Sequence, residues 1–219
     1  MRNIGVDEHY HVLNRGSDKQ TIFRDRRDWI RFLFLILHFQ SPSINFPQLG
    51  RSVSHFVKTQ SFDIDDEVLE KIAADRAVEL VAFALIPNHF HLILREVKEG
   101  GIARYMQRAE GAYAKYFNTK YERVGHLFQG SYKSVHVGDN DQLLYLSAYI
   151  HRNPRELKDW KGKEFDYPWS SFQDYINGGR WGNLLVSSII FDQFNGGDDY
   201  KKFVGSSGAK DLDEELVLE

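Results

Sequence analysis

The sequence predicts an α+β fold, a ferredoxin-like sandwich in which an antiparallel sheet carries helices on one face. Two observations lead to this prediction. Strand-like and helix-like segments follow one another in the order strand, helix, strand, strand, helix, strand, helix. The chain of 219 residues is long enough to bury a core, and its 42% hydrophobic and 27% charged residues are ordinary for a globular protein.

The first part of the chain predicts a strand, a helix and a variable segment. Residues 10–14 alternate like a strand, and residues 26–39 carry apolar side chains at helical spacing. Pro, Ser, Gly and Asn crowd residues 41–54, which indicates a loop, and residues 63–76 resemble a short, charged helix. We therefore expect residues 41–76 to be an insertion.

The middle of the chain predicts a hairpin followed by a long helix. Residues 78–86 form an apolar run of strand length, and the tight connection Pro87-Asn88 leads into a second strand at 89–97. After the break at Gly100-Gly101, apolar positions at helical spacing predict a helix over 102–121.

A last strand and helix complete the predicted domain, which spans residues 1–160. Residues 127–137 resemble a strand interrupted by Gly130. Asp139 is a suitable N-cap for a helix from about residue 140, which Pro154 ends. Beyond the domain we expect two further parts: an extension packed on it at 161–195 and an acidic, mobile tail at 196–219.

His89 and His91 are the most informative residues of the chain, because they lie one residue apart in the second strand of the hairpin. Side chains alternate along a strand, so both imidazoles share one face while Phe90 points to the core. Two such imidazoles can converge on one divalent metal ion. The alternative is a pair of half-buried strand histidines without a ligand.

Composition limits the chemistry and the setting of the protein. Without cysteine, a metal site must use His, carboxylate, amide or water ligands. The start of the chain lacks an apolar signal segment and no run approaches about 20 apolar residues, so we expect a cytoplasmic protein without a membrane partner. Residues 95–158 hold eleven Lys or Arg against seven Asp or Glu, which suits a partner with negative charge and stackable bases.

The last predicted helix places Tyr145, Tyr149 and Asn153 four residues apart and therefore on one face. A tyrosine can act as a nucleophile if a neighbouring cation or base helps to remove its proton, and an Asn oxygen can complete a metal shell. The alternatives are packing tyrosines and a helix-ending Asn before Pro154. Tyr149 is favoured over Tyr145 because only Tyr149 has Asn153 four residues on.

Four motifs taken together carry a family resemblance that runs from about Tyr10 to Tyr175. In order, they are P-N-H-F-H-L, Y-F-N-T-K-Y-E-R-V-G-H-L-F-Q-G-S-Y-K-S, Y-I-H-R-N-P and Y-P-W-S-S-F. In order and spacing they resemble the single-tyrosine transposases of the HUH class, named after the His-hydrophobic-His motif. Within that class the chain looks most like the REP-associated tyrosine transposases, and this resemblance implies an HUH endonuclease type of fold.

The resemblance also implies roles for individual residues. His89 and His91 match the metal-binding histidines, Asn153 matches a third metal-contacting amide, and Tyr149 matches the nucleophile. The implied cofactor is Mg²⁺ or Mn²⁺, and His ligands suit Mn²⁺ better. The implied reaction is cleavage and strand transfer of single-stranded DNA hairpins through a 5′-phosphotyrosyl intermediate. No nucleotide-binding loop is present in the sequence, in keeping with a reaction that needs no external energy.

Basic and aromatic residues of the middle segment are the candidates for binding this DNA. Phosphate contacts are expected from Arg104, Arg108, Lys115, Lys120, Arg123 and Lys133, with His126 as a polar contact in the G-H-L-F-Q-G turn. Stacking candidates are Tyr113, Tyr116, Phe117 and Phe128, several of which must instead belong to the core. Ser131 stands where the family often has Arg, which removes one expected phosphate contact.

Other functions and assemblies stay open at this point. One alternative is a catalytically silent DNA-hairpin-binding protein. Another is a hydrolase that activates water with His-x-His. It would need further ligands at the ends of barrel strands, and this chain is too short for a barrel and lacks the alternating strand–helix repeats. The family resemblance is compatible with a monomer, in which the tyrosine acts in its own chain, and with a homodimer that shares its active sites.

Overall fold

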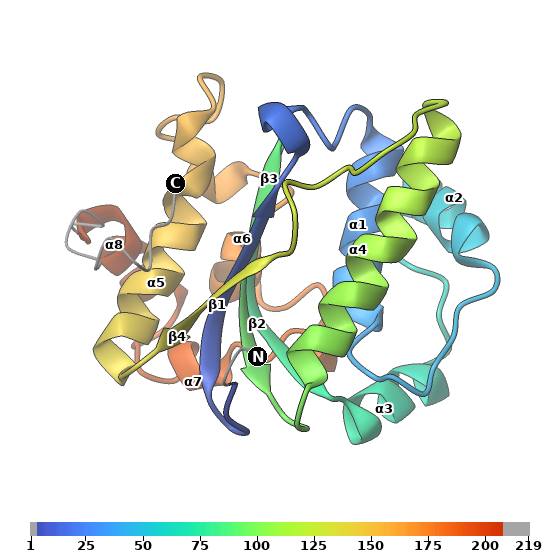
Figure 1. Ribbon diagram of the computed structural model, residues 1–219. Coiled ribbons are helices and arrows are strands. Elements are labelled where there is room, and N and C mark those ends of the chain that lie inside the picture. The colour runs from blue at the N-terminus through green and yellow to red at the C-terminus, as the bar shows by residue number, and fades with distance from the viewer. Residues whose placement is uncertain (1–3, 208–219) are drawn as a thin grey trace.

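The computed structural model describes residues 4–207, and they form a four-stranded antiparallel sheet with helices on both sides (Figure 1). The strands are β1 (His9–Arg15), β2 (Val78–Ile86), β3 (His89–Glu96) and β4 (Lys133–Val137), in the order β2-β3-β1-β4. The α-helices are α1 (Arg26–His38), α2 (Leu49–Thr59), α3 (Asp66–Asp75), α4 (Gly101–Lys120), α5 (Asn140–Arg152), α6 (Phe172–Asn177), α7 (Ser188–Phe191) and α8 (Gly197–Ser206). This chain order and strand order confirm the predicted ferredoxin-like α+β fold.

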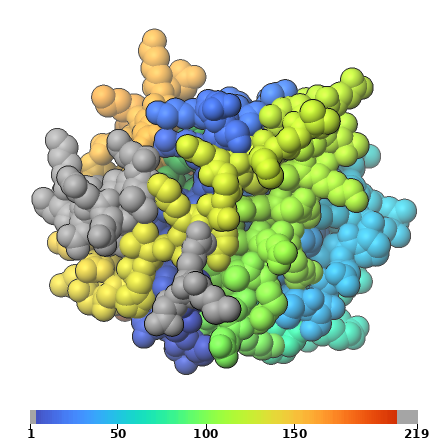
Figure 2. All heavy atoms as spheres, viewed as in Figure 1, coloured from blue at the N-terminus to red at the C-terminus, as the bar shows by residue number. Residues whose placement is uncertain are grey.

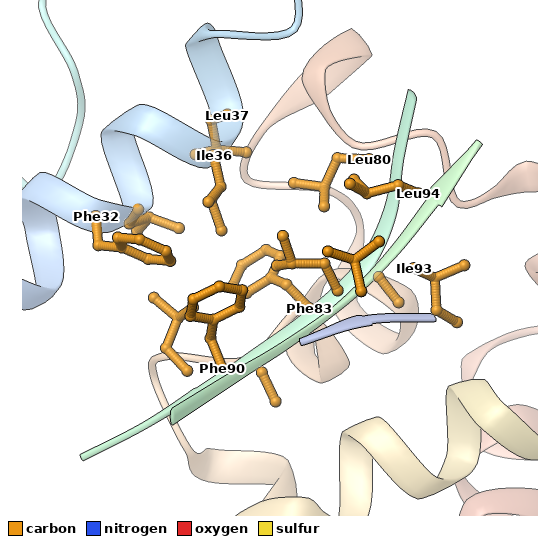
Figure 3. Close-up of a cluster of buried hydrophobic side chains, with 14 of the residues drawn as sticks. Phe32, Ile36, Leu37, Leu80, Phe83, Phe90, Ile93 and Leu94 are labelled. Atoms are coloured by element: carbon orange, nitrogen blue, oxygen red, sulfur yellow. The ribbon is translucent and has the colours of Figure 1, made fainter. Parts of the chain in front are cut away.

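One face of the sheet packs on α1 and α4, and this layer contains the largest part of the apolar core. Phe32 of α1 and Phe90 of β3 are fully buried, with ring centroids 4.9 Å apart (Figure 3). Glu96 is also buried, because its carboxylate accepts hydrogen bonds from the backbone N–H groups of Gly101 and Ile102 at the start of α4. The side chains of this core fix β3 in register against the helices.

The second face of the sheet is covered too, which corrects the expectation of helices on one face only. Helix α5 lies across it, with α8 beside α5 and α6 beside α8 (Figure 1). Strands β2 and β3 are buried on both faces, and Ala84 and Ile93 are fully buried. Strands this apolar need a second layer of helices. No helix within residues 4–207 is long and apolar enough to cross a membrane.

The acidic end of the chain is ordered as far as residue 207, contrary to the expectation of a mobile tail from residue 196. Tyr200 of α8 is fully buried, and its hydroxyl lies 2.7 Å from Nδ1 of His151 on α5. The other ring nitrogen of His151 lies 2.8 Å from Oγ of Ser171. The apolar side chains of α8 pack on the rest of the protein, although the first turn of the helix contains two aspartates. The rest of the expected tail, 208–219, lies outside the described residues.

Two segments differ in secondary structure from the prediction. Residues 49–59 form α2 instead of a loop, because Leu49, Val53 and Phe56 are buried at helical spacing against α1. Residues 127–132 do not belong to β4. Phe128 makes only an isolated bridge to Gly16, and Gly130 has a φ of 85°, in the left-handed region. The predicted helix at 63–76 is present as α3.

Candidate active site

His89 and His91 lie on the face of β3 that meets α5. They are 5% and 4% exposed, and their ring centroids lie 5.0 Å apart in a T-shaped arrangement. Phe90 points the opposite way, into the layer under α1. The strand alternation therefore brings both imidazoles together, as predicted.

Helix α5 brings Tyr149 and Asn153 to the same histidines. The helix begins at the predicted cap, where the side chain of Asp139 accepts a hydrogen bond from the backbone N–H of Gln142. At one end of the site, Oδ1 of Asn153 lies 3.2 Å from Nε2 of His89. The ring centroid of Tyr149 lies 5.6 Å from that of His91, nearly at right angles to it.

Tyr145, the competing nucleophile, points elsewhere. Its side chain is 45% exposed, and its ring packs on Phe203 of α8 at a centroid distance of 5.7 Å. Tyr149 lines the same cleft as His89 and His91, whereas Tyr145 does not. The structure therefore supports Tyr149 as the tyrosine of this site.

Asn88 fixes the orientation of His89. Its side-chain nitrogen donates to the backbone carbonyl of Lys19, and its Oδ1 lies 2.7 Å from Nδ1 of His89. Because an amide oxygen only accepts, Nδ1 of His89 must carry the proton and Nε2 must carry the lone pair. Nε2 then faces Oδ1 of Asn153 as one acceptor faces another, an arrangement that a cation bound by both atoms would stabilise.

Burial keeps both imidazoles neutral. Desolvation, helped by the positive charge of Arg15, lowers the pKa of His89 to about 4, although the contact with Asn153 acts in the opposite direction. Desolvation also lowers the pKa of His91 well below its ordinary value, with smaller effects from His11 and His89. At neutral pH both rings therefore offer the uncharged form that binds metals.

The ligands that this site offers to a metal ion are imidazole nitrogens and an amide oxygen. Within residues 4–207, no group of three or more His, Cys, Asp or Glu side chains is arranged to hold one. The set consists of His89, His91 and the amide oxygen of Asn153. Neighbouring ligands of an octahedral ion with bonds of about 2.1 Å lie about 3 Å apart. The 3.2 Å between His89 Nε2 and Asn153 Oδ1 fits this requirement.

The site opens into a cleft of about 770 Å³. Its rim is cationic, with Arg15, Lys19 and Lys133 from three separate positions around β1 and β4. The other lining residues are Leu13, Asn14, His89, His91, Gln129, Ser131, Tyr149 and Glu156. A cleft with this rim can attract a polyanion to the tyrosine.

The segment between α4 and β4 builds one wall of this cleft. Its backbone is held to the end of β1, because Gln129 N–H donates to the carbonyl of Arg15 and Ser17 N–H donates to that of Leu127. In Figure 2 the yellow-green atoms of this segment lie beside the blue atoms of the turn after β1. The contact brings Gln129 and Ser131 to the cleft.

Among the seven predicted DNA-binding residues, only Lys133 lines the cleft. It is exposed at the start of β4, opposite Leu13 of β1. Arg104, Lys115 and His126 are exposed but lie outside the cleft lining. A phosphate contact by any of these four residues stays a prediction.

The other three predicted DNA-binding residues are engaged within the fold. Arg108 donates to the backbone carbonyls of Phe39, Ser41 and Ile44 and thereby ties α4 to the loop after α1. Lys120 pairs with Asp25 and Asp28, and Arg123 bonds the side chain of Asn118. These contacts give the three cations structural roles, and a DNA contact by any of them stays a prediction.

Most of the candidate stacking residues belong to the core, as was expected for several of them. Tyr113, Phe117 and Phe128 are buried in the core, where no base can reach them. Tyr116 is partly buried and donates its hydroxyl to Oδ1 of Asp28. The apolar face of α4 therefore serves packing, because α1 covers it.

Sequence reasoning missed His11 and most of the cationic rim. His11 is fully buried, and its Nε2 lies 2.9 Å from Nδ1 of His91. Arg15 and Lys19 lie at the end of β1 and in the following turn, far from the basic middle segment in sequence. The strand pattern of residues 10–14 was the available signal, but it does not show which strand lies beside β3.

Comparisons with known proteins show which family this chain resembles. Residues 55–153 match the family model described as "Transposase IS200 like". A solved structure of a REP-associated tyrosine transposase bound to a REP hairpin resembles the chain, with 17% identity and a TM-score of 0.44, over 79% of this chain and 81% of that one. No curated protein matches. The family model confirms the resemblance found in the sequence as one to the IS200-like transposases over residues 55–153, the segment that holds His89, His91, Tyr149 and Asn153.

Proposed function

We propose that this chain is a metal-dependent DNA endonuclease and strand transferase that acts on single-stranded DNA hairpins, as a REP-associated tyrosine transposase would. One observation carries the proposal. Tyr149 and two neutral histidines line a cleft with a cationic rim, and the amide of Asn153 contacts one of these histidines. Each part has a use in phosphoryl transfer, and the family match covers all four residues.

The residues that would hold the cofactor, Mg²⁺ or Mn²⁺, are His89, His91 and Asn153. Imidazole ligands favour Mn²⁺, because Mg²⁺ prefers oxygen. Bound there, the ion would polarise the scissile phosphate and offset the negative charge that builds up during attack. The protein's own part is to keep both imidazoles neutral and the ligand atoms in place.

Tyr149 supplies the nucleophile. Its phenolic oxygen forms a bond to phosphorus while the bond from phosphorus to the 3′ oxygen breaks, which leaves a 5′-phosphotyrosyl link and a free 3′-hydroxyl. The proton that the phenol releases balances the one that the leaving oxygen takes up. Attack by a second 3′-hydroxyl on the link restores Tyr149 and rejoins the DNA.

The geometry also supports a site that one chain completes. The ring of Tyr149 lies within 5.6 Å of His91 and 6.2 Å of His11 of the same chain, centroid to centroid. This arrangement favours a tyrosine that acts on a phosphate bound by its own histidines. It is compatible with a monomer. The location of the protein in the cytoplasm stays a separate prediction.

Adduct formation tests the proposed function. With Mn²⁺, the protein is expected to form a covalent complex, stable on a denaturing gel, with a hairpin labelled at its 3′ end. A 5′ label should leave with the fragment that carries the 3′-hydroxyl, and EDTA should prevent the adduct. Hairpin binding without any adduct would favour the catalytically silent alternative, and cleavage without an adduct would favour attack by water.

The cationic rim makes a separate prediction about DNA affinity. Lys133→Gln is expected to weaken hairpin binding and to reduce the slope of log K against log salt by roughly 0.7–0.9, since one phosphate contact is lost. Lys58→Gln is the matched control, because Lys58 is exposed on α2 outside the cleft. Fluorescence anisotropy at several salt concentrations measures both. Equal slopes for wild type and Lys133→Gln would place the DNA elsewhere.

A further inference from the structure

His11 is a buried imidazole that the proposed chemistry does not yet use. It lies on β1 opposite Ile93 of β3, and Leu13 lies opposite His91. Partner residues of an antiparallel pair point to the same face, so His11 shares the face of the two candidate ligands. Its Nε2 lies 2.9 Å from Nδ1 of His91, and the two rings are stacked at 5.1 Å.

The proton in this contact decides whether His91 can bind a cation through Nε2. A hydrogen bond between two neutral imidazoles contains one N–H donor and one acceptor. If Nδ1 of His91 donates, its Nε2 keeps a lone pair. If His11 donates instead, neutral His91 must carry its proton on Nε2 and has no lone pair left to offer there.

His89 shows which arrangement this site uses. Oδ1 of Asn88 accepts the proton of His89 Nδ1, and this leaves Nε2 facing Asn153. In both histidines Nδ1 faces a buried or half-buried polar partner, and the partner of His91 is Nε2 of His11. We propose that His11 is a positioning residue that accepts the Nδ1 proton of His91 and so keeps Nε2 of His91 available to the cation.

This role rests on the proposed function, because it concerns the metal ligands of that site. It also explains why the partner is an imidazole inside a fully buried position. A neutral acceptor there orients the ligand and adds no charge to the core, whereas a carboxylate in the same place would have to be desolvated. Partners behind metal-binding histidines commonly change metal affinity by 10–100-fold.

The test compares the wild type with His11→Leu and His11→Gln. In the metal-free wild type, ¹H–¹⁵N correlation spectra of the imidazoles should show His91 protonated on Nδ1. His11→Leu should mix the two tautomers and weaken Mn²⁺ binding about 10–100-fold by titration calorimetry. His11→Gln should restore most of both, since its side-chain oxygen can accept the same proton. Thermal unfolding of each variant checks that it is folded.

The outcomes separate this inference from the proposed function. A wild-type His91 protonated on Nε2 overturns the role of His11, and this measurement needs neither a variant nor DNA. Unchanged tautomer and unchanged Mn²⁺ affinity in folded His11→Leu overturn it as well. If the tautomer and the Mn²⁺ affinity respond as expected but no DNA adduct forms, the nuclease proposal fails while the positioning role holds.

Discussion

Tyr149→Phe should form no covalent adduct with a hairpin, a loss of at least about 10³-fold in the rate of strand cleavage. Removal of the phenolic oxygen deletes the only atom of Tyr149 that can bond to phosphorus, while the ring and its packing against His91 are kept. Hairpin affinity is therefore expected to stay within about twofold of the wild type, because the cations of the cleft rim, Arg15, Lys19 and Lys133, are left in place. Denaturing gels and anisotropy measure the two quantities.

Tyr145→Phe is the matched control for this prediction. The two tyrosines are one helical turn apart on α5, but Tyr145 packs on Phe203 and does not line the cleft. Its substitution should leave both the adduct and the affinity unchanged. An adduct that persists in Tyr149→Phe, or that disappears in Tyr145→Phe, would refute the assignment of the nucleophile.

Asp28→Ala is expected to lower the free energy of unfolding by about 3–5 kcal/mol, the largest effect on stability that we predict. Asp28 is fully buried at the start of α1, and its carboxylate accepts from Lys120, Tyr116 and Tyr121. Its Oδ2 also accepts from the backbone N–H of Arg24. Truncation leaves these donors without their acceptor in a region with little water. Urea denaturation followed by circular dichroism measures the loss.

The same cluster explains the state of Lys120. Partial burial alone would lower the pKa of its ammonium, but the hydrogen bonds to Asp25 and Asp28 outweigh that effect and raise it.

The control for Asp28→Ala is Glu67→Ala. It removes an exposed i,i+4 pair with Lys71 on α3, and it should leave the unfolding curve unchanged. A loss for Asp28→Ala no larger than that for Glu67→Ala would contradict the structural role given to this cluster.

Local pattern was enough to predict the strands β1, β2 and β3, the long helices and the histidine pair. The hairpin β2–β3, the helix α4 and the cap at Asp139 each depend on residues close together in sequence. The shared face of His89 and His91 follows from strand alternation alone. The position of Asn153 one turn after Tyr149 follows from helical periodicity in the same way.

Contacts between distant segments were the part that local pattern could not give. A Lys or Arg in a basic segment looks free until its acceptor is known, and Lys120 finds Asp28 more than 90 residues earlier. The guanidinium of Arg108 likewise donates to a backbone carbonyl of the loop after α1. His11 could not be paired with His91 before the strand order was known, because β1 is far from β3 in sequence.

The place of β1 in the sheet has a consequence for any attempt to isolate the candidate site on a shorter fragment. The segment that matches the transposase family starts at residue 55, yet β1 lies between β3 and β4, which both belong to that segment. A fragment cut at that boundary would have a gap at the centre of its sheet and would lack His11, Arg15 and Lys19. The amino-terminal strand must therefore be supplied, on the same polypeptide or as a separate peptide, before the remaining residues can form the complete sheet and the candidate site.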